Sequence, residues 1–522
     1  MNLKLELNET KKFNKHYQFC IGSGHAPLAL RKDYCQQLKL IHDTLGIKRV
    51  RFHGIFSDDM NVVIRLSDII PVPGSERFVD INFSRIKEVY DNVLESGMKP
   101  LVELSFMPKH FAKNLNNHVM FYYGNDSYNC MPYDDKIWQD FIKEFIKFLL
   151  DVYGKKEVES WLFEVWNEPD LVVFFSGNRE DYFHLYEITV LAIKEVDSNI
   201  MVGGPSTSGS KWIKEFLNFV KERNIPLDFV TTHQYAGDPI GNIDGINLEI
   251  KEERHDSPFS NPNILKDVKD GSILDGIRHV FIDKSEIKDI RNDSIIINSR
   301  QTRNVIGDLP LYYTEWNENA TFSAYTNDTR KVSSFLVMTS LKVADTINGS
   351  SVWCFSDIFE ELHMFNEEFH GGFGLLTHHG IPKPSYYAMR FLNEIGDERY
   401  ILDDSINDIT YGAFKDELDN VQLLITRQNM KNLKLDSEDV NIRINKVFSK
   451  ATIQGITENS GNPLKLYEEM GSPKYLSNSD INRIKEESKV NEENLDLEII
   501  SNETILKLNL FINDTYLIKL FK

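Results

Sequence analysis

The sequence predicts an α/β protein, a (β/α)8 TIM barrel that carries an accessory C-terminal β-sandwich domain. Two features predict the barrel: eight short apolar runs end at polar, Gly or Pro positions, and longer amphipathic segments separate them. After about residue 400 the chain changes to short alternating stretches, which indicate antiparallel strands. With 522 residues, the chain also exceeds the size at which one hydrophobic core keeps growing, so a second domain is expected.

The eight apolar runs are the expected barrel strands. They cover residues 18–22, 49–53, 100–105, 161–166, 200–203, 228–233, 311–315 and 351–355. Apolar residues recur at three- and four-residue steps between them, which predicts helices at 34–45, 83–96, 137–153, 179–196, 210–223 and 331–346. The rival interpretation is a doubly wound sheet, but Gly22-Ser23-Gly24-His25 lacks the full glycine fingerprint of a dinucleotide site.

The C-terminal region has the period-two pattern of strands. Such stretches occupy 421–425, 440–444, 495–500, 504–510 and 516–521, and residues 478–489 indicate a helix capped at Ser479. Residues 3–7 alternate in the same way and suit an extra strand of the sandwich. We therefore expect an N-terminal strand within 1–14 that joins the sandwich, a catalytic barrel over 15–395, and the sandwich over 396–522.

One segment, residues 236–308, is too long and too polar for an ordinary connection between a strand and a helix. We expect it to hold the sixth helix and an elaborated loop. Because such loops build the rim of a barrel's active face, this insertion is a candidate for shaping substrate entry.

Charge and cysteine usage exclude several classes of protein. The formal net charge of −20 would repel nucleic acids and anionic membrane surfaces, so neither is an expected partner. Residues 1–15 contain no apolar signal region, which leads us to expect a cytoplasmic location. The four cysteines are scattered without metal-ligand spacing, so we expect buried thiols and no metal site.

Two glutamates end predicted barrel strands. Glu168 lies in Trp166-Asn167-Glu168-Pro169 after the fourth run, and Glu315 lies in Thr314-Glu315-Trp316 at the end of the seventh. Side chains at these strand ends enter the mouth of a barrel, where active sites of this fold lie. Retaining glycosidases need two carboxyl groups roughly 5–5.5 Å apart, one protonated and one ionised. The residues alone do not decide which glutamate has which role.

Five further motifs accompany the two glutamates. They are Arg51-Phe52-His53-Gly54 with Asp58-Asp59, His233-Gln234-Tyr235, the run from Trp353 to Glu361, the run from Phe369 to Leu375, and Gly471-Ser472-Pro473-Lys474-Tyr475. Together this set resembles glycoside hydrolase family 39, and its bacterial β-xylosidases in particular. The resemblance covers almost the whole chain.

The resemblance implies a role for each candidate site residue. Glu168 would be the acid/base, Glu315 the nucleophile, Asn167 a donor to the sugar 2-hydroxyl and Tyr235 the group that orients the nucleophile. The remaining candidates would line the pocket for the terminal sugar: His53, His233, Trp353, Glu360 and Glu361. It further implies no metal or organic cofactor, an oligosaccharide or aryl glycoside substrate, and a homo-oligomer, since family members often form tetramers.

We therefore expect a retaining exo-β-glycosidase, a β-xylosidase that releases xylose from the non-reducing end of xylo-oligosaccharides. The alternatives are another retaining glycosidase (β-glucosidase, β-galactosidase or iduronidase-like) and a non-catalytic carbohydrate-binding barrel. Two departures from the xylosidase pattern concern leaving-group or entry surfaces: Phe175 stands where Trp is usual, and the 236–308 segment is longer.

Overall fold

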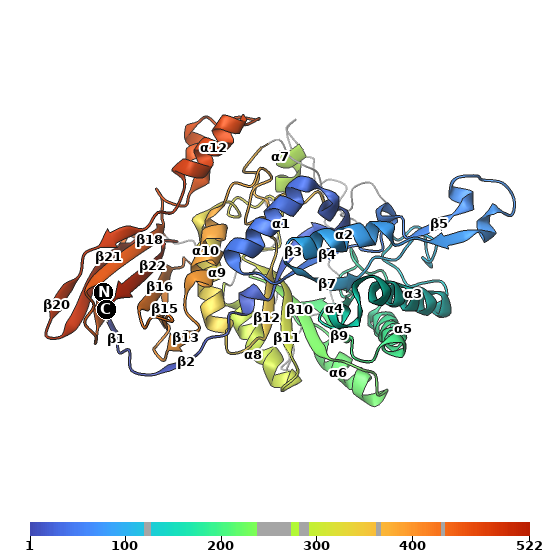
Figure 1. The fold of residues 1–522 in the computed structure, drawn as a ribbon, viewed down its shortest axis with the longest axis horizontal. Helices are drawn as coiled ribbons and strands as arrows, with labels where there is room; N and C mark the ends of the chain where they lie inside the picture. The colour runs from blue at the N-terminus through green and yellow to red at the C-terminus, as the bar shows by residue number, and fades with distance from the viewer. Residues whose placement is uncertain (120–126, 237, 239–272, 281–291, 362–366, 430–433) are drawn as a thin grey trace.

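A computed structural model describes residues 1–119, 127–236, 238, 273–280, 292–361, 367–429 and 434–522. Eight parallel strands close into a barrel at the centre of the molecule, in the order β10-β11-β12-β3-β4-β7-β8-β9 (Figure 1). They are β3 (Cys20–His25), β4 (Arg49–His53), β7 (Lys99–Leu104), β8 (Leu162–Val165), β9 (Met201–Ser208), β10 (Phe229–Tyr235), β11 (Leu311–Asn317) and β12 (Gly349–Val352). The predicted barrel is confirmed.

Helices surround this barrel and alternate with its strands. They are α1 (Lys32–Leu45), α2 (Ser84–Glu95), α3 (Asp135–Tyr153), α4 (Lys155–Val158), α5 (Arg179–Val196), α6 (Ile213–Glu222), α8 (Ser294–Ile306), α9 (Arg330–Val343) and α10 (Pro384–Glu394). Local sequence fixes their ends. Asp134 caps α3 by accepting from the backbone N–H of Ile137 at 3.0 Å, and α1 ends at Gly46 with φ of 67°, a conformation that favours glycine.

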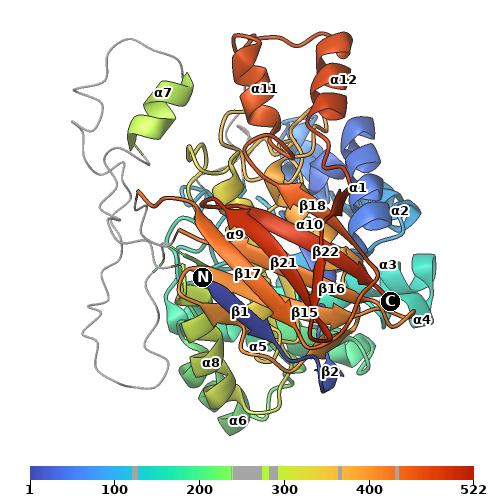
Figure 2. The same cartoon turned by 90° about the vertical axis from the view of Figure 1, so that its left-hand side faces the viewer.

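The C-terminal region forms two facing sheets, at the left of Figure 1 and towards the viewer in Figure 2. One sheet has the order β1-β17-β21-β20, with β1 (Asn2–Leu5), β17 (Glu438–Ile444), β21 (Glu503–Leu510) and β20 (Glu498–Ile500). The other has the order β19-β18-β22-β16-β15-β13-β2. Its strands are β19 (Glu493–Leu495), β18 (Lys450–Ile456), β22 (Thr515–Phe521), β16 (Val421–Arg427), β15 (Ile409–Lys415), β13 (Glu398–Tyr400) and β2 (Thr10–Lys12), with β14 (Ser405–Ile406) beside β15.

The sandwich confirms the predicted fold class but corrects two details. The single strand expected at 495–500 is two strands, β19 and β20, which belong to opposite sheets. The helix expected at 478–489 is α12 (Asn478–Glu487), and its cap is Ser477 rather than Ser479. Ser477 caps the helix because its side chain accepts from the N–H of Asp480, while the Asp480 carboxylate accepts from the N–H of Ser477. This reciprocal arrangement is a capping box.

Three smaller elements extend from the two main bodies. The short helix α11 (Pro463–Glu469) packs beside α12 above the sandwich (Figure 2). Strands β5 (Val63–Arg65) and β6 (Val79–Ile81) pair into an arm that projects from the barrel at the right of Figure 1. Within the described ranges, no helix combines the length and apolar character needed to cross a lipid bilayer.

Separate apolar clusters hold the barrel and the sandwich. Trp138, Phe141 and Phe145 on one face of α3 belong to the barrel cluster, and Leu423 and Ile442 to the cluster between the two sheets. Two barrel helices contact the sandwich: α9 touches β15, β16 and β22, and α10 touches β18. The sandwich therefore packs against the outer helices on one side of the barrel.

The long 236–308 segment contains the expected sixth helix, which is α8. A short helix, α7 (Ile273–Arg278), precedes it. The rest of the elaborated loop, at 237, 239–272 and 281–291, lies outside the described residues. Its influence on substrate entry stays a prediction.

Candidate active site

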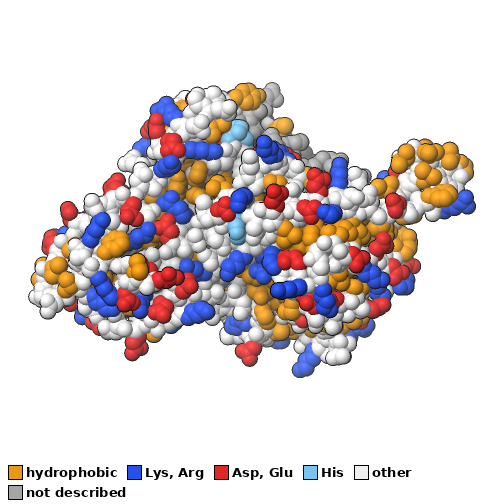
Figure 3. Space-filling model, in the orientation of Figure 1, with side chains coloured by type: hydrophobic (Ala, Val, Ile, Leu, Met, Phe, Trp, Pro, Cys, Tyr) orange, Lys and Arg blue, Asp and Glu red, His pale blue; other side chains and the backbone are white. Residues whose placement is uncertain are grey.

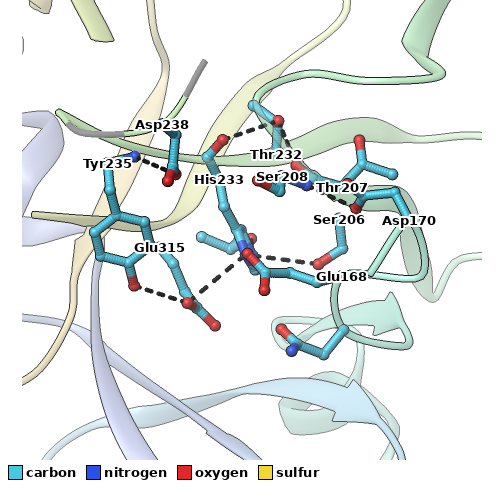
Figure 4. A network of polar contacts seen from close by, with 12 residues as sticks. Glu168, Asp170, Ser206, Thr207, Ser208, Thr232, His233, Tyr235, Asp238 and Glu315 are labelled. Carbon is cyan, nitrogen blue, oxygen red and sulfur yellow. Dashed lines mark hydrogen bonds and ion pairs between the residues drawn. The ribbon is translucent and has the colours of Figure 1, made fainter. Parts of the chain in front are cut away.

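The two predicted catalytic glutamates meet at the carboxyl end of the barrel. One carboxylate oxygen of Glu168, one of Glu315 and a ring nitrogen of His233 lie within 4.8 Å of one another. Glu168 follows β8 by three residues, while Glu315 lies on β11 directly opposite His233 on β10. Figure 4 shows the two glutamates approaching each other across His233. Both are almost fully buried, with 7% and 5% of their surface exposed.

Two donors contact Glu315 from different strands. Arg51 on β4 donates from Nη1 to Oε1 at 2.7 Å. Tyr235 on β10 donates its hydroxyl to Oε2 at 2.9 Å (Figure 4). A carboxylate with one donor on each oxygen is held in a fixed orientation, and its negative charge is stabilised. Glu315 is thus prepared to act as an anion.

Glu168 lies in a different electrostatic environment. Burial and then the negative charge of Asp170 raise the pKa of Glu168 to about 8, so its carboxyl group carries a proton at neutral pH. Its Oε1 lies 3.0 Å from Nδ1 of His233. Burial lowers the pKa of His233, so that imidazole is neutral. The site therefore holds one carboxylic acid beside one carboxylate.

Beneath Glu315, a network of buried charges centres on Arg51. Besides Glu315, Arg51 contacts Glu164 at 2.6 Å and Glu103 at 2.8 Å, and each of these side chains is fully buried. His53 joins the network through Nδ1, 2.7 Å from Glu103. Burial disfavours the imidazolium, but the charges of Glu103 and Glu315 outweigh it and raise the pKa of His53 to about 9.

Three of the predicted sugar-contacting groups converge on this centre. Asn167 accepts from Arg51 at 2.9 Å, and its Nδ2 has no hydrogen-bond partner among the described residues. Trp353 lies with its ring centroid 4.8 Å from that of His53. Burial raises the pKa of Glu361 to about 8, and its Oε1 lies 3.9 Å from His53 Nε2. A free amide donor, an apolar ring and a neutral carboxyl group suit a polyol.

The structure separates Glu360 from its neighbour. Glu360 pairs with Arg31 in a half-exposed position, whereas Glu361 is buried beside His53. The backbone of Glu360 has φ of 52°, in the left-handed region, where the chain turns. Glu360 is therefore absent from the converging set. Phe175, whose position suggested altered leaving-group contacts, is buried 5.6 Å from the ring of Trp166.

The supporting charges around Arg51 were not predicted from the sequence. Arg51 was noticed only as part of a motif, and neither Glu103 nor Glu164 was singled out. A signal was available, because both glutamates stand inside strand runs that are otherwise apolar. Asp170 and Asp238 were not among the predicted site residues either. Burial raises the pKa of Asp238 to about 7. Figure 4 shows Asp170 beside Ser208 and Asp238 beside Tyr235.

Distances alone would let Glu168, His233 and Glu315 hold a cation. Arg51 already places a positive charge 2.7 Å from Glu315, and a protonated Glu168 is a poor ligand. These residues therefore suit acid–base chemistry better than metal binding. Elsewhere in the described part of the chain, Glu368, His378 and His379 meet the same distance criterion.

The chain is similar to known proteins along most of its length. The model of the glycosyl hydrolases family 39 matches residues 1–259 and 278–496. A β-xylosidase from Caldicellulosiruptor saccharolyticus is 34% identical over 512 residues, which covers 96% of this chain and 95% of the relative. A β-xylosidase from Geobacillus stearothermophilus is 30% identical over 475 residues, covering 90% and 86%.

Solved structures show the same architecture. A β-xylosidase of the same family from Caulobacter crescentus superposes with a TM-score of 0.75 at 27% identity, over the full length of both chains. A monomeric β-xylosidase from Caulobacter crescentus CB15 superposes with a TM-score of 0.78 at 27% identity, covering 100% of this chain and 99% of the other.

Proposed function

Because the chain belongs to glycosyl hydrolase family 39, we propose that it is a retaining exo-β-xylosidase that releases xylose from the non-reducing end of xylo-oligosaccharides. One observation carries the mechanism: carboxylate oxygens of Glu168 and Glu315 lie within 4.8 Å of each other. Retaining enzymes separate the two carboxyl groups by roughly 5–5.5 Å, whereas inverting enzymes need roughly 6.5–9.5 Å for a water molecule.

In the first step, the Glu315 carboxylate attacks the anomeric carbon while Glu168 donates its proton to the glycosidic oxygen. The C–O bond breaks, the remaining sugar leaves as an alcohol, and a glycosyl ester forms on Glu315. Arg51 and Tyr235 hold the nucleophile, and the neutral His233 fixes the acid. The pKa of Glu168, near 8, keeps the proton available at neutral pH.

In the second step, Glu168 is a carboxylate and takes a proton from water. The water oxygen attacks the anomeric carbon, the ester bond to Glu315 breaks, and xylose leaves with its original configuration. The free Nδ2 of Asn167 is available to donate to the 2-hydroxyl, a contact that strengthens as positive charge develops on the sugar ring.

The chemistry of the site favours a neutral sugar. Glu361 and Glu315 offer acidic groups, and the guanidinium of Arg51 is fully buried and occupied by carboxylates. An iduronidase-like pocket would need a free cation for the sugar carboxylate. We therefore expect an iduronide to be hydrolysed slowest. The two β-xylosidase relatives lead us to expect an aryl β-xyloside to be hydrolysed faster than the matching β-glucoside or β-galactoside, and a panel of these substrates measures the order.

Replacing each glutamate tests the assignment. Glu315→Ala should lower turnover of an aryl β-xyloside by roughly 10⁴-fold or more, because no nucleophile remains. Glu168→Ala should accumulate the glycosyl-enzyme, and added azide should restore turnover by forming a β-xylosyl azide. Glu318→Gln is the matched control, since Glu318 is equally buried but pairs with Lys331. Turnover of Glu315→Ala within tenfold of the parent would refute the nucleophile.

NMR of the first sugar released distinguishes the remaining alternatives. β-Xylose indicates retention, and α-xylose would contradict the double displacement. A non-catalytic carbohydrate-binding barrel would bind xylobiose in calorimetry but release no sugar at all.

The proposed assembly is a homo-oligomer, with a tetramer as the expected form. The projecting β5–β6 arm supports it, because large apolar side chains stand exposed there and colour it orange in Figure 3. They are Ile69, Ile70, Val72, Phe78 and Val79. Light scattering tests this: Phe78→Asp together with Ile69→Asp should shift an oligomer to monomer, and a monomeric parent would contradict the proposal.

Four free thiols suit the proposed cytoplasmic location, which cell fractionation tests.

A further inference from the structure

Three potential metal ligands lie together outside the glutamate site. Glu368 and the adjacent pair His378-His379 belong to the segment between β12 and α10, and one ligand atom from each lies within 4.8 Å of the others. The segment contacts α12, because Lys485 donates to the carbonyl oxygen of His379 at 2.8 Å. None of these side chains takes part in the proposed reaction.

Both imidazoles converge on the same oxygen of Glu368. Oε2 lies 3.2 Å from Nε2 of His378 and 2.5 Å from Nδ1 of His379. Zinc binds such ligands at roughly 2.0–2.1 Å with tetrahedral geometry, which places ligand atoms roughly 3.4 Å apart. The His378 distance already fits, and the His379 ring would need to withdraw from Oε2 by about 0.9 Å.

The surroundings leave room for one further ligand. Glu368 is buried, with 2% of its side chain exposed, while 44% of the His379 side chain is exposed. A water molecule can therefore complete the coordination from the solvent side. The other oxygen of Glu368, Oε1, accepts from the hydroxyl of Thr377, so Oε2 is directed towards the two rings. Such outer hydrogen bonds commonly fix the orientation of a metal-binding carboxylate.

We propose that Glu368, His378 and His379 form a binding site for a divalent transition-metal ion, with zinc as the best fit. Two imidazoles and one carboxylate match the ligand preference of Zn²⁺ better than that of Mg²⁺ or Ca²⁺, which favour oxygen ligands. The ion joins Glu368 to the turn at 377–380 and so fastens this segment beside α12. The site stands apart from the glutamate pair and does not depend on the proposed reaction.

Calorimetric titration of chelator-treated full-length protein with Zn²⁺ tests the site. The parent should bind one ion at these ligands, and His379→Asn should weaken that binding by about tenfold or more. Asn keeps an N–H donor for Glu368 but is a poor zinc ligand, so the ion pair and the metal site are distinguished. His184→Asn is the control, because His184 has the same exposure and one carboxylate partner, Asp135 at 2.7 Å.

A second arm separates this site from the active centre. Glu168→Gln should keep the zinc stoichiometry, and zinc should raise the melting temperature of the parent and His184→Asn but not of His379→Asn. The proposal fails if the parent binds no zinc, if His379→Asn binds it as tightly as the parent does, or if only Glu168→Gln loses it. Each result leaves the xylosidase proposal to be judged on its own assays.

Discussion

The mouth of the barrel and the core of the sandwich bury side chains of opposite character. Around Arg51 the barrel mouth buries Glu103, Glu164 and Glu315, all with 6% or less of the side chain exposed. The sandwich cluster consists of apolar residues, such as Leu423 and Leu506. Burying each ion costs several kcal/mol before pairing recovers it, whereas apolar burial is favourable outright. The sandwich core therefore contributes stability, whereas the barrel mouth is built for chemistry.

Strand geometry explains how one chain builds both. On β21 the side chains of Leu506, Leu508 and Leu510 are buried while their neighbours Lys507 and Asn509 are exposed, because only one face of that sheet is covered. On β4 four of five residues are buried, because helices cover the outer face of the strand and its inner face lies inside the barrel. Arg51 and His53 therefore lie where carboxylates from other strands, such as Glu103 on β7, can pair with them.

Removing the central cation should have the largest effect. Arg51→Met leaves Glu103, Glu164 and Glu315 buried without their shared partner, so we expect the folded state to lose roughly 3–5 kcal/mol. Loss of a donor to the nucleophile should also lower kcat/KM by roughly 10²–10³-fold. Urea unfolding and aryl xyloside kinetics measure the two effects.

Arg51→Lys sharpens that result. It keeps the charge, but one ammonium group cannot reproduce the fork that reaches three carboxylates and Asn167. We expect most of the stability to return while kcat/KM stays low. Full activity in either variant would mean that the network serves folding alone.

The sandwich should show the reverse behaviour. Leu506→Ala empties a fully buried position between the sheets, so unfolding should become easier by roughly 2–5 kcal/mol. kcat/KM at 25 °C should remain within about twofold, because the site lies in the other body. Leu418→Ala is the control, since that leucine is 80% exposed at the turn between β15 and β16. A large loss of activity in folded Leu506→Ala would contradict the separation of roles.

The sequence was sufficient to locate the two catalytic candidates, because parallel barrel strands bring their carboxyl ends to one rim whatever lies between them. It could not show that Arg51 bridges Glu103, Glu164 and Glu315, since reach across the barrel axis depends on tilt and register. The adjacent glutamates 360 and 361 make the same point. One positive φ sends Glu360 to Arg31 and leaves its neighbour beside His53.

A smaller effect is expected on the pH profile. Asp170 raises the pKa of Glu168, after burial, so Asp170→Asn should lower it. The acid must be protonated in the first step, so kcat/KM falls as pH rises through this pKa. The basic limb, expected near pH 8 in the parent, should therefore move to lower pH in Asp170→Asn.

Lys211 has the opposite effect on the pKa of Glu168. It pairs with Asp170 at 3.0 Å and lowers the pKa of Glu168. Lys211→Met should therefore move the basic limb to higher pH. If this pair had only a structural role, both substitutions would change kcat without moving the basic limb in opposite directions. That outcome would mean that Asp170 does not set the pKa of Glu168.

The smallest predicted effect concerns the cap at the N-terminus of α12. Ser479 was expected to cap the helix, but Ser477 accepts from the N–H of Asp480 at 3.2 Å and Asp480 accepts in return at 3.0 Å. Ser477→Ala should destabilise α12 by about 1 kcal/mol, whereas Ser479→Ala should change it by less than about 0.5 kcal/mol. Hydrogen exchange of the α12 amides measures both. Equal protection in the two variants would mean that packing against α11, rather than the cap, decides where this helix begins.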